Sequence, residues 1–289
     1  MKKIRTDDLQ PGMVLAKTIY ATDGRVLAKE NAAISDMLLR RLQSLGLPAA
    51  YIQDPGHPAG AEIISEATRM DAVNYLSRLE TEIRSGRNDK ILHDKKILNH
   101  LVYEVIAGQK NGNFLTDIRL HQGYIHGHSV NVCAWAIRIG LSLEYTTAKL
   151  EELAIGALFH DIGMYKVPLE ILHKTAPLTK QETEKLNSHP QAGFDLLKQN
   201  WNFPAVSAHV AYQHHERFNG TGYPRRLAGE AIHEYARITA VVDVFDAMTS
   251  ERVYRPAFSV PETVRYLIEQ RGIQFDPRIV AVFLEILED

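Results

Sequence analysis

The spacing of hydrophobic and polar residues divides the chain into a short region of mixed structure and a long helical region. Over residues 12–29, two apolar segments flank the dipeptide Asp23-Gly24. Asp-Gly favours a tight hairpin turn because both residues tolerate a positive φ angle. Farther along, residues 49–52 form a short apolar run that predicts another strand. These signals indicate strands in the first part of the chain.

One helix is predicted between these strands. Ser35 can cap its N-terminus through the side-chain oxygen, and Gly46 follows Leu45 at the point where the helix should end. Together, the helix and the strands predict a small α+β module over residues 1–55. Because we find no cluster of titratable residues in this module, we interpret it as a regulatory or docking module that binds a protein partner.

Residues 56–112 are predicted to be a linker followed by a helical connector. Pro and Gly are frequent over residues 54–60, and both residue types interrupt helices and strands. Over residues 62–110, apolar residues recur at helical spacing with mixed charges on the other face. The pattern leaves two alternatives open. The connector packs on the C-terminal part of the chain, or it pairs with a second protomer to form a homodimer.

The C-terminal part, residues 113–289, has an almost wholly helical pattern. Apolar residues repeat with helical spacing over residues 150–158 and again over residues 238–245. Residues 128–141 are apolar nearly all round, which predicts a central helix. The predicted fold class is therefore mainly α, with an all-helical domain preceded by a small α+β domain.

Composition narrows the classes of partner. The net charge of -2 provides no long-range attraction for nucleic acid or for an anionic membrane, so we expect no DNA, RNA or membrane partner. No stretch reaches the roughly 18 apolar residues of a membrane-spanning helix. Cys133 is the single cysteine, which excludes an intramolecular disulfide and fits a reducing compartment. These observations predict a cytoplasmic protein.

The candidate metal-ligating residues are arranged around His160 and Asp161, which follow one another at the end of an apolar helical segment. Burying an imidazole and a carboxylate without partners is costly, and a divalent cation would compensate both. Further histidines and aspartates recur at wide intervals around this pair. The candidate metal ligands are His128, His160, Asp161, His189, His214, His215 and Asp243.

This set of nitrogen and oxygen ligands suits Fe, Mn, Zn, Co or Ni better than Ca, and the absence of thiolates argues against a structural zinc site. Seven ligands exceed what one ion needs. We therefore predict two divalent ions that share Asp161 as a bridging carboxylate, an arrangement suited to phosphoryl displacement. Asp246 lies three residues after Asp243 on the same helical face, where it could orient a ligand from behind.

A loop rich in glycine follows the paired histidines. Its Gly222-Tyr223-Pro224 segment can bring backbone N–H groups close to an anion, so we predict that it forms the rim of a substrate site. Arg252 and Arg255 carry guanidinium groups suited to bidentate phosphate contacts. Their spacing alone is equally compatible with a plain surface role.

Taken together, these motifs resemble those of the HD-GYP family, which belongs to the all-helical HD phosphohydrolase superfamily. The resemblance covers residues 113–289 and implies a metal-dependent phosphodiesterase. Such enzymes hydrolyse the bacterial second messenger cyclic di-GMP to pGpG and often on to GMP, with a two- or three-metal centre of iron or manganese. The matching motifs, in order, are His160-Asp161, His189-Pro190, His214-His215-Glu216, Gly222-Tyr223-Pro224 and the run from Asp243 to Ser250.

The resemblance implies a role for each matching residue. His160 and Asp161 are the expected catalytic residues that match the family, and Lys166 is a further catalytic candidate that the family pattern does not contain. Substrate contacts are expected from Gly222, Tyr223, Pro224, Arg252 and Arg255. One ion would be held by His128, His160, Asp161 and Asp243, and the other by Asp161, His189, His214 and His215. The segment from Leu9 to Leu15 also resembles the small module often found ahead of such domains.

Two positions depart from the family pattern. Tyr124 stands where members with a third metal carry a glutamate, which favours two ions. Met164 stands where the family usually has a lysine that meets a substrate phosphate, and Lys166 is the candidate to replace it. The complete ligand set favours an enzyme. Met164 favours the alternative, a catalytically weak or inactive cyclic di-GMP receptor that signals through its N-terminal module.

Overall fold

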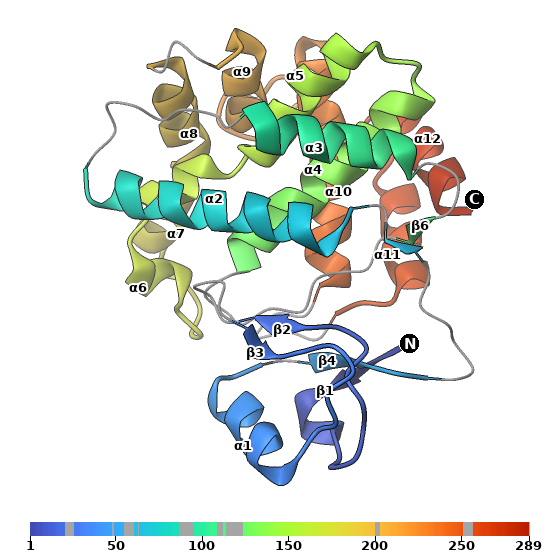
Figure 1. Cartoon of the computed structure of the whole chain (residues 1–289). Coiled ribbons are helices and arrows are strands. Elements are labelled where there is room, and N and C mark those ends of the chain that lie inside the picture. The colour runs from blue at the N-terminus through green and yellow to red at the C-terminus, as the bar shows by residue number, and fades with distance from the viewer. Residues whose placement is uncertain are drawn as a thin grey trace.

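The fold consists of a small N-terminal module of strands and one α-helix, next to a larger and mainly helical part (Figure 1). This arrangement confirms the predicted fold class. It comes from a computed structural model, which describes residues 1–20, 26–47, 49–54, 61–62, 64–86, 95–108, 112–113, 124–199, 203–250 and 257–288.

The N-terminal module contains two pairs of antiparallel strands. β1 (Lys2–Arg5) pairs with β4 (Ala49–Ile52), and β2 (Ile19–Tyr20) pairs with β3 (Val26–Ala28). The turn expected at Asp23-Gly24 lies outside the described residues. The sequence did not predict β1, because three of its four residues are charged and its pairing with β4 spans the whole module.

A helix completes this module as predicted. The short 3₁₀ helix η1 (Thr6–Asp8) follows β1, and α1 (Asp36–Ser44) lies between the later strands. The Ser35 hydroxyl oxygen accepts a hydrogen bond from the Leu38 N–H at 3.2 Å, which caps α1. The module has a small core of its own, formed by buried aliphatic residues that include Leu15, Ile34 and Leu42.

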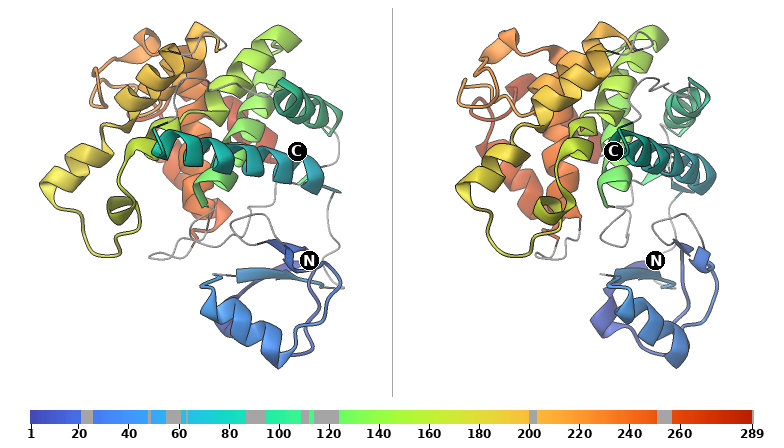
Figure 2. Two further views of the ribbon diagram at one scale, coloured as in Figure 1. Left: turned by 60° about the vertical axis from the view of Figure 1, so that its left-hand side comes forward. Right: turned by 90° about the vertical axis from the view of Figure 1, so that its left-hand side faces the viewer.

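The connector contains two helices, α2 (Glu66–Arg84) and α3 (Lys95–Ala107). Before and after them, β5 (Ala61–Glu62) pairs in parallel with β6 (Gly112–Asn113). The apolar faces of α2 and α3 belong to the same core as the C-terminal helices, so the structure shows the first of the two alternatives left open by the sequence. Figure 2 shows α2 running across the helical part on the side of the N-terminal module.

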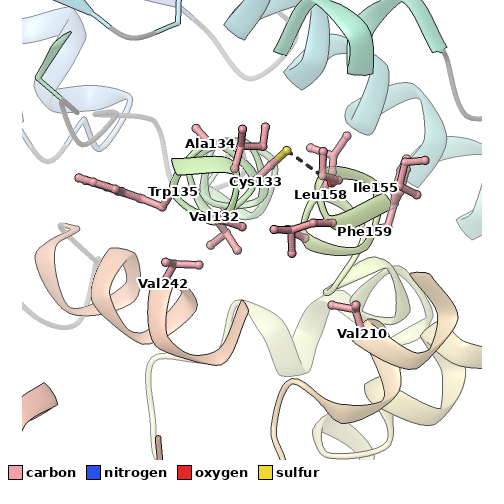
Figure 3. Packing of buried hydrophobic residues seen from close by; sticks show 14 of the residues in the cluster. Val132, Cys133, Ala134, Trp135, Ile155, Leu158, Phe159, Val210 and Val242 are labelled. Carbon is pink, nitrogen blue, oxygen red and sulfur yellow. Dashed lines mark hydrogen bonds between the residues drawn. The ribbon is translucent and has the colours of Figure 1, made fainter. Parts of the chain in front are cut away.

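The core of the helical part surrounds α4 (Tyr124–Ser142), as its apolar sequence predicted. Trp135 of this helix meets Phe245 and Phe283 edge-on, with ring centroids 5.5 and 5.3 Å apart. Figure 3 shows Cys133 among these apolar residues, where its thiol donates to the Ala154 carbonyl at 3.4 Å. Burial raises the pKa of Cys133, which agrees with its expected role as a small buried hydrophobe.

The other helices surround this core, and several of them carry candidate ligands at their ends. None of the helices that the structure describes is both long enough and apolar enough to cross a bilayer. The elements after α4 are α5 (Thr147–Leu158), η3 (Ile162–Lys166), α6 (Leu169–Leu172), α7 (Lys180–Leu186), α8 (His189–Lys198), α9 (Ala205–Gln213), η4 (Gly229–Ala231), α10 (Glu234–Thr249), α11 (Val260–Glu269) and α12 (Pro277–Glu288).

Candidate metal centre

Helix ends bring most of the candidate ligands together. His160 and Asp161 lie between the end of α5 and the start of η3, and His189 is the first residue of α8. His214 and His215 follow the last turn of α9. The remaining two, His128 and Asp243, lie within α4 and α10. Ligands from five separate segments therefore converge on one place.

The seven ligands form two adjacent groups. His128, His160 and Asp243 make up the first group, and Asp161, His189, His214 and His215 make up the second. Within each group, the possible ligand atoms lie within 4.8 Å of one another. This spacing is short enough for every member of a group to reach a common ion.

Asp161 lies between the two groups. Its Oδ2 is 3.5 Å from His160 Nε2 in the first group. Its Oδ1 is 3.3 Å from His189 Nε2 and 3.5 Å from His214 Nε2 in the second. The two oxygens of one carboxylate thus face different groups, as a bridging ligand requires.

Three of the histidines are oriented by backbone carbonyls. The Nδ1–H of His160 donates to the Ala157 carbonyl at 2.8 Å, and that of His189 donates to Leu186 at 2.8 Å. His214 donates to the Ala211 carbonyl at 3.0 Å. Because a neutral imidazole carries one proton, each Nε2 is left with a lone pair directed at the centre.

His128 is oriented by a carboxylate instead. Its Nδ1 lies 2.7 Å from Asp246 Oδ2, and its Nε2 lies 3.0 Å from Asp243 Oδ1. Asp246 therefore contacts the ring nitrogen of His128 that faces away from the centre, and it can orient this ligand as the sequence predicted. Such outer partners fix both the tautomer and the direction of a ligating imidazole.

The donor atoms fit a divalent cation. The Nε2 atoms of His189 and His214 are 3.3 Å apart, and those of His189 and His215 are 3.1 Å apart. Lone pairs so close together repel unless a positive charge lies between them. In addition, His160 Nε2 and Asp161 Oδ1 are buried without a hydrogen-bond partner of suitable geometry. Buried polar atoms rarely lack partners, and an ion would supply them.

Electrostatics keep both aspartates ionised. Burial by itself would raise the pKa of Asp161, but the surrounding imidazoles of His160, His189 and His214 lower it well below its usual range. In the same way, His128 outweighs burial and lowers the pKa of Asp243. At neutral pH both groups are carboxylates, which is the form that binds a metal.

Burial holds two of the histidines neutral. Burial lowers the pKa of His160 to about 4. Burial and the adjacent His214 and His189 likewise lower the pKa of His215. The pKa of His214 shifts upward instead, because the Asp161 carboxylate outweighs burial. Neutral imidazole is the ligand form, so His160 and His215 can bind an ion without first releasing a proton.

Gly163 allows η3 to lie directly against the start of α8. A Cβ atom at this position would be 1.9 Å from the His189 carbonyl oxygen and 2.6 Å from the Gly193 nitrogen. Only glycine permits so close an approach. At the other end of η3, Arg84 of α2 donates to the Val167 carbonyl at 2.8 Å. These contacts fix the segment that carries Asp161, and the sequence pattern did not reveal either of them.

The Gly-Tyr-Pro loop lies against the second ligand group. The Tyr223 ring stacks on His215, with centroids 4.9 Å apart and planes tilted by 21°. A Cβ at Gly222 would be 2.5 Å from Glu216 Cα, so the chain folds tightly back on itself here. The buried Glu216 carboxylate accepts hydrogen bonds from the backbone N–H groups of Arg225 at 2.7 Å and Leu227 at 3.1 Å. Glu216 thus stabilises the conformation of the loop. The sequence indicated only that Glu216 follows the paired histidines, and it did not predict this role.

The two aspartates of the centre are partly exposed to solvent. His160 is fully buried, whereas Asp161 and Asp243 keep 13% and 14% of their side chains exposed. Tyr223 is also partly exposed, and Pro224 is exposed. The two aspartates and the loop are therefore among the parts of the centre that solvent reaches.

The remaining predicted residues differ in their placement. Met164 follows Asp161 by one turn of the 3₁₀ helix and donates its backbone N–H to the Asp161 carbonyl at 2.8 Å. Side chains three residues apart eclipse in this helix type, so Met164 lies on the side of Asp161 and Lys166 does not. Lys166 is exposed. Arg252 and Arg255 fall outside the described residues, as does the side chain of Tyr124.

Comparisons with known proteins agree with this geometry. A model of the HD domain family matches residues 115–279. The chain is similar to the cyclic di-GMP phosphodiesterase PA4108 of Pseudomonas aeruginosa, at 32% identity over 80% of this chain and 57% of that protein. It is also similar to the cyclic di-GMP phosphodiesterase response regulator RpfG of Xanthomonas campestris, at 42% identity over 52% of this chain and 39% of that protein.

The chain thus spans about half the length of these curated relatives. Among solved structures, it is similar to Bd1817, a HDG"Y"P protein from Bdellovibrio bacteriovorus, with a TM-score of 0.60. The match covers 100% of this chain and 99% of that chain at 16% identity, and it shows that the two share a fold.

Proposed function

Because the chain belongs to the HD domain family, as its motifs predicted, we propose that it is a phosphodiesterase that hydrolyses cyclic di-GMP to pGpG and on to GMP. Two curated relatives bear the name of cyclic di-GMP phosphodiesterase. One observation carries the proposal. Two ligand groups meet at the partly exposed Asp161, and Tyr223 of the Gly-Tyr-Pro loop stacks on His215 of the second group.

The ligands divide between two divalent ions, which we expect to be iron or manganese. His128, His160 and Asp243 would hold one ion, His189, His214 and His215 would hold the other, and Asp161 would contact both. When bound, such ions supply the positive charge that a displacement at phosphorus requires. The remaining task of the protein is to place the phosphodiester there.

Several residues are suited to that task. Tyr223 lies on His215 and can limit how the substrate enters, while Gly222 and Pro224 shape the loop around it. We propose that Arg252 and Arg255 contact phosphate oxygens, since guanidinium groups bind them in a bidentate manner. Binding at both the loop and the arginines would align the phosphodiester with the two groups.

The test is hydrolysis by metal-analysed protein prepared without oxygen. We expect protein loaded with manganese or iron to convert cyclic di-GMP first to pGpG and then to GMP, as separated by chromatography. A parallel incubation with the mixed cyclic dinucleotide of GMP and AMP would identify the preferred base. Loaded protein that yields no product from either dinucleotide would contradict the proposal.

Metal content is a separate test of the centre. With Tyr124 in place of the glutamate of three-metal members, we expect two ions per chain by elemental analysis. A ratio near three, or no bound metal after careful reconstitution, would contradict the two-ion assignment.

A second candidate function rests on Met164. The side of Asp161 on which a lysine would meet a phosphate carries an uncharged side chain instead. This favours a receptor that binds cyclic di-GMP, turns it over slowly or not at all, and signals through the N-terminal module to a protein partner. Calorimetric binding of cyclic di-GMP to loaded protein, without product after prolonged incubation, would identify the receptor.

A further inference from the structure

We propose that Arg69 of α2 is a positioning residue for the metal centre, which holds His128 in place through Asn131 and Asp246. The inference rests on the proposed metal-binding function, although it concerns a residue outside both ligand groups. Arg69 belongs to the connector, which lies before the part of the chain that the HD domain model matches.

A continuous chain of hydrogen bonds joins these four residues. A guanidinium Nη1–H of Arg69 donates to Asn131 Oδ1, and Asn131 Nδ2 donates to Asp246 Oδ1 at 2.8 Å. The other oxygen of Asp246 lies 2.7 Å from His128 Nδ1. Each of the four residues is no more than 6% exposed. The chain therefore runs from the connector helix to a metal ligand through the interior of the protein.

The donors and acceptors of these four side chains allow only one arrangement of the hydrogen bonds. A guanidinium can only donate and a carboxylate can only accept, so the Asn131 amide must turn its oxygen to Arg69 and its nitrogen to Asp246. With Oδ1 of Asp246 occupied by Asn131, Oδ2 is left to accept the Nδ1–H of His128. That tautomer places the lone pair of His128 on Nε2, which faces Asp243 at 3.0 Å.

Burying the Arg69 side chain costs free energy, and the packing of α2 does not require it. A guanidinium group carries a positive charge, and burying a charge is unfavourable without good partners. The other buried residues on the central part of α2 are apolar and would pack without it, namely Ala72, Val73, Leu76 and Leu79. Instead, only the side-chain amide of Asn131 separates the positive charge of Arg69 from the carboxylate of Asp246.

The first test measures the affinity for metal. Arg69→Met keeps the aliphatic stem and removes the guanidinium, and calorimetric titration of the full metal-free chain with Mn²⁺ follows both ions. We expect about a 10-fold loss of affinity in one binding step, because outer partners of metal ligands contribute 10- to 100-fold. The other binding step should not change. Arg78→Met, which removes an exposed arginine from the same helix, is the matched control and should change neither step.

A double-mutant cycle separates this role from general packing. Asn131→Leu interrupts the same chain of bonds, so Arg69→Met should cause no further loss in that background. Additive losses from the two substitutions, or an equal loss in both binding steps, would overturn the proposal. Asn131→Asp is a second variant that keeps the size of the side chain but places a carboxylate against Asp246. It should weaken the same single step.

The tautomer of His128 provides a measurement that needs no metal. Long-range proton–nitrogen NMR correlations of the metal-free protein should show His128 with its proton on Nδ1 in the wild type and in Arg78→Met. In Arg69→Met we expect a mixture of tautomers, and an unchanged spectrum would contradict the proposal. If the wild type bound no Mn²⁺, the proposed function would fail, while this spectrum would still decide whether Arg69 acts on His128.

Discussion

The two ligand groups meet at Asp161, and His128 of the first group is oriented by a side chain, whereas His160 in the same group is oriented by a backbone carbonyl, as in the second group. In the first group, His128 depends on the side chain of Asp246 and on the buried residues behind it. In the second group, His189 and His214 donate to backbone carbonyls at the ends of helices. Side chains can be replaced singly, whereas a carbonyl moves only with its helix. Substitutions away from the centre should therefore act on His128 through hydrogen bonds, and on His160, His189 and His214 through the position of the segments that carry the carbonyls.

Asp161→Ala should remove this difference, because both groups lose the carboxylate they share. We expect both ions to be lost and hydrolysis to fall at least about 1000-fold, equivalent to roughly 4 kcal/mol. Asp243→Ala should mainly weaken the first group. Elemental analysis and product chromatography measure both effects, and hydrolysis that survives in the Asp161 variant would rule out the bridging role.

Gly163→Ala should act most strongly on the second group, and to a lesser extent on the segment that carries Asp161. The added methyl group cannot fit against the His189 carbonyl, so α8 must shift and carry His189 with it. We expect loss of one ion and a decrease of about 1 to 3 kcal/mol in the free energy of unfolding. Gly193→Ala is the graded control, since its Cβ would be 3.3 Å from the nearest atom and should have a smaller effect. Equal effects of the two variants would contradict this reasoning.

Asp246→Asn should act on the first group alone. The amide keeps the shape of the side chain but cannot accept hydrogen bonds from both Asn131 and His128 through oxygen. We expect about a 10-fold weaker binding of one Mn²⁺ ion, with the other unchanged. Asp195→Asn, on the exposed face of α8, is the control. Weaker binding of both ions would show that the two groups are not oriented independently.

Met164→Lys should leave both groups intact and change only the rate. A lysine here would place a positive charge on the side of Asp161, where a substrate phosphate is expected. We predict a 10- to 100-fold faster hydrolysis, roughly 1.4 to 2.7 kcal/mol, without a change in metal affinity. Lys166→Ala, made in both backgrounds, is the comparison. If it alone abolished hydrolysis, Lys166 would be the residue that holds the phosphate.

Much of the fold and the identities of the candidate ligands were predictable from sequence because both leave local signals. Helical spacing predicted α4, α5 and α10, and the chemistry of histidine and aspartate identified residues that the structure brings together. How the ligands are oriented was less accessible. Arg69 and Asn131 are 62 residues apart, and no spacing rule connects them. The close approach of Gly163 to His189 depends on how two segments pack, which a pattern along one chain does not record.

The backbone carbonyls that orient His160, His189 and His214 have a consequence for how the protein acquires its metal. The Ala157 and Ala211 carbonyls belong to helices that are packed into the core, so the packing of the chain itself directs His160 and His214 inward, whereas the Leu186 carbonyl lies at the end of α7 on the surface. Loading and exchange can then proceed on the folded chain, unlike in domains that fold only around their metal. Ligands of this kind accept several transition metals, and the supply of each metal during growth becomes a determinant of which ion is found there.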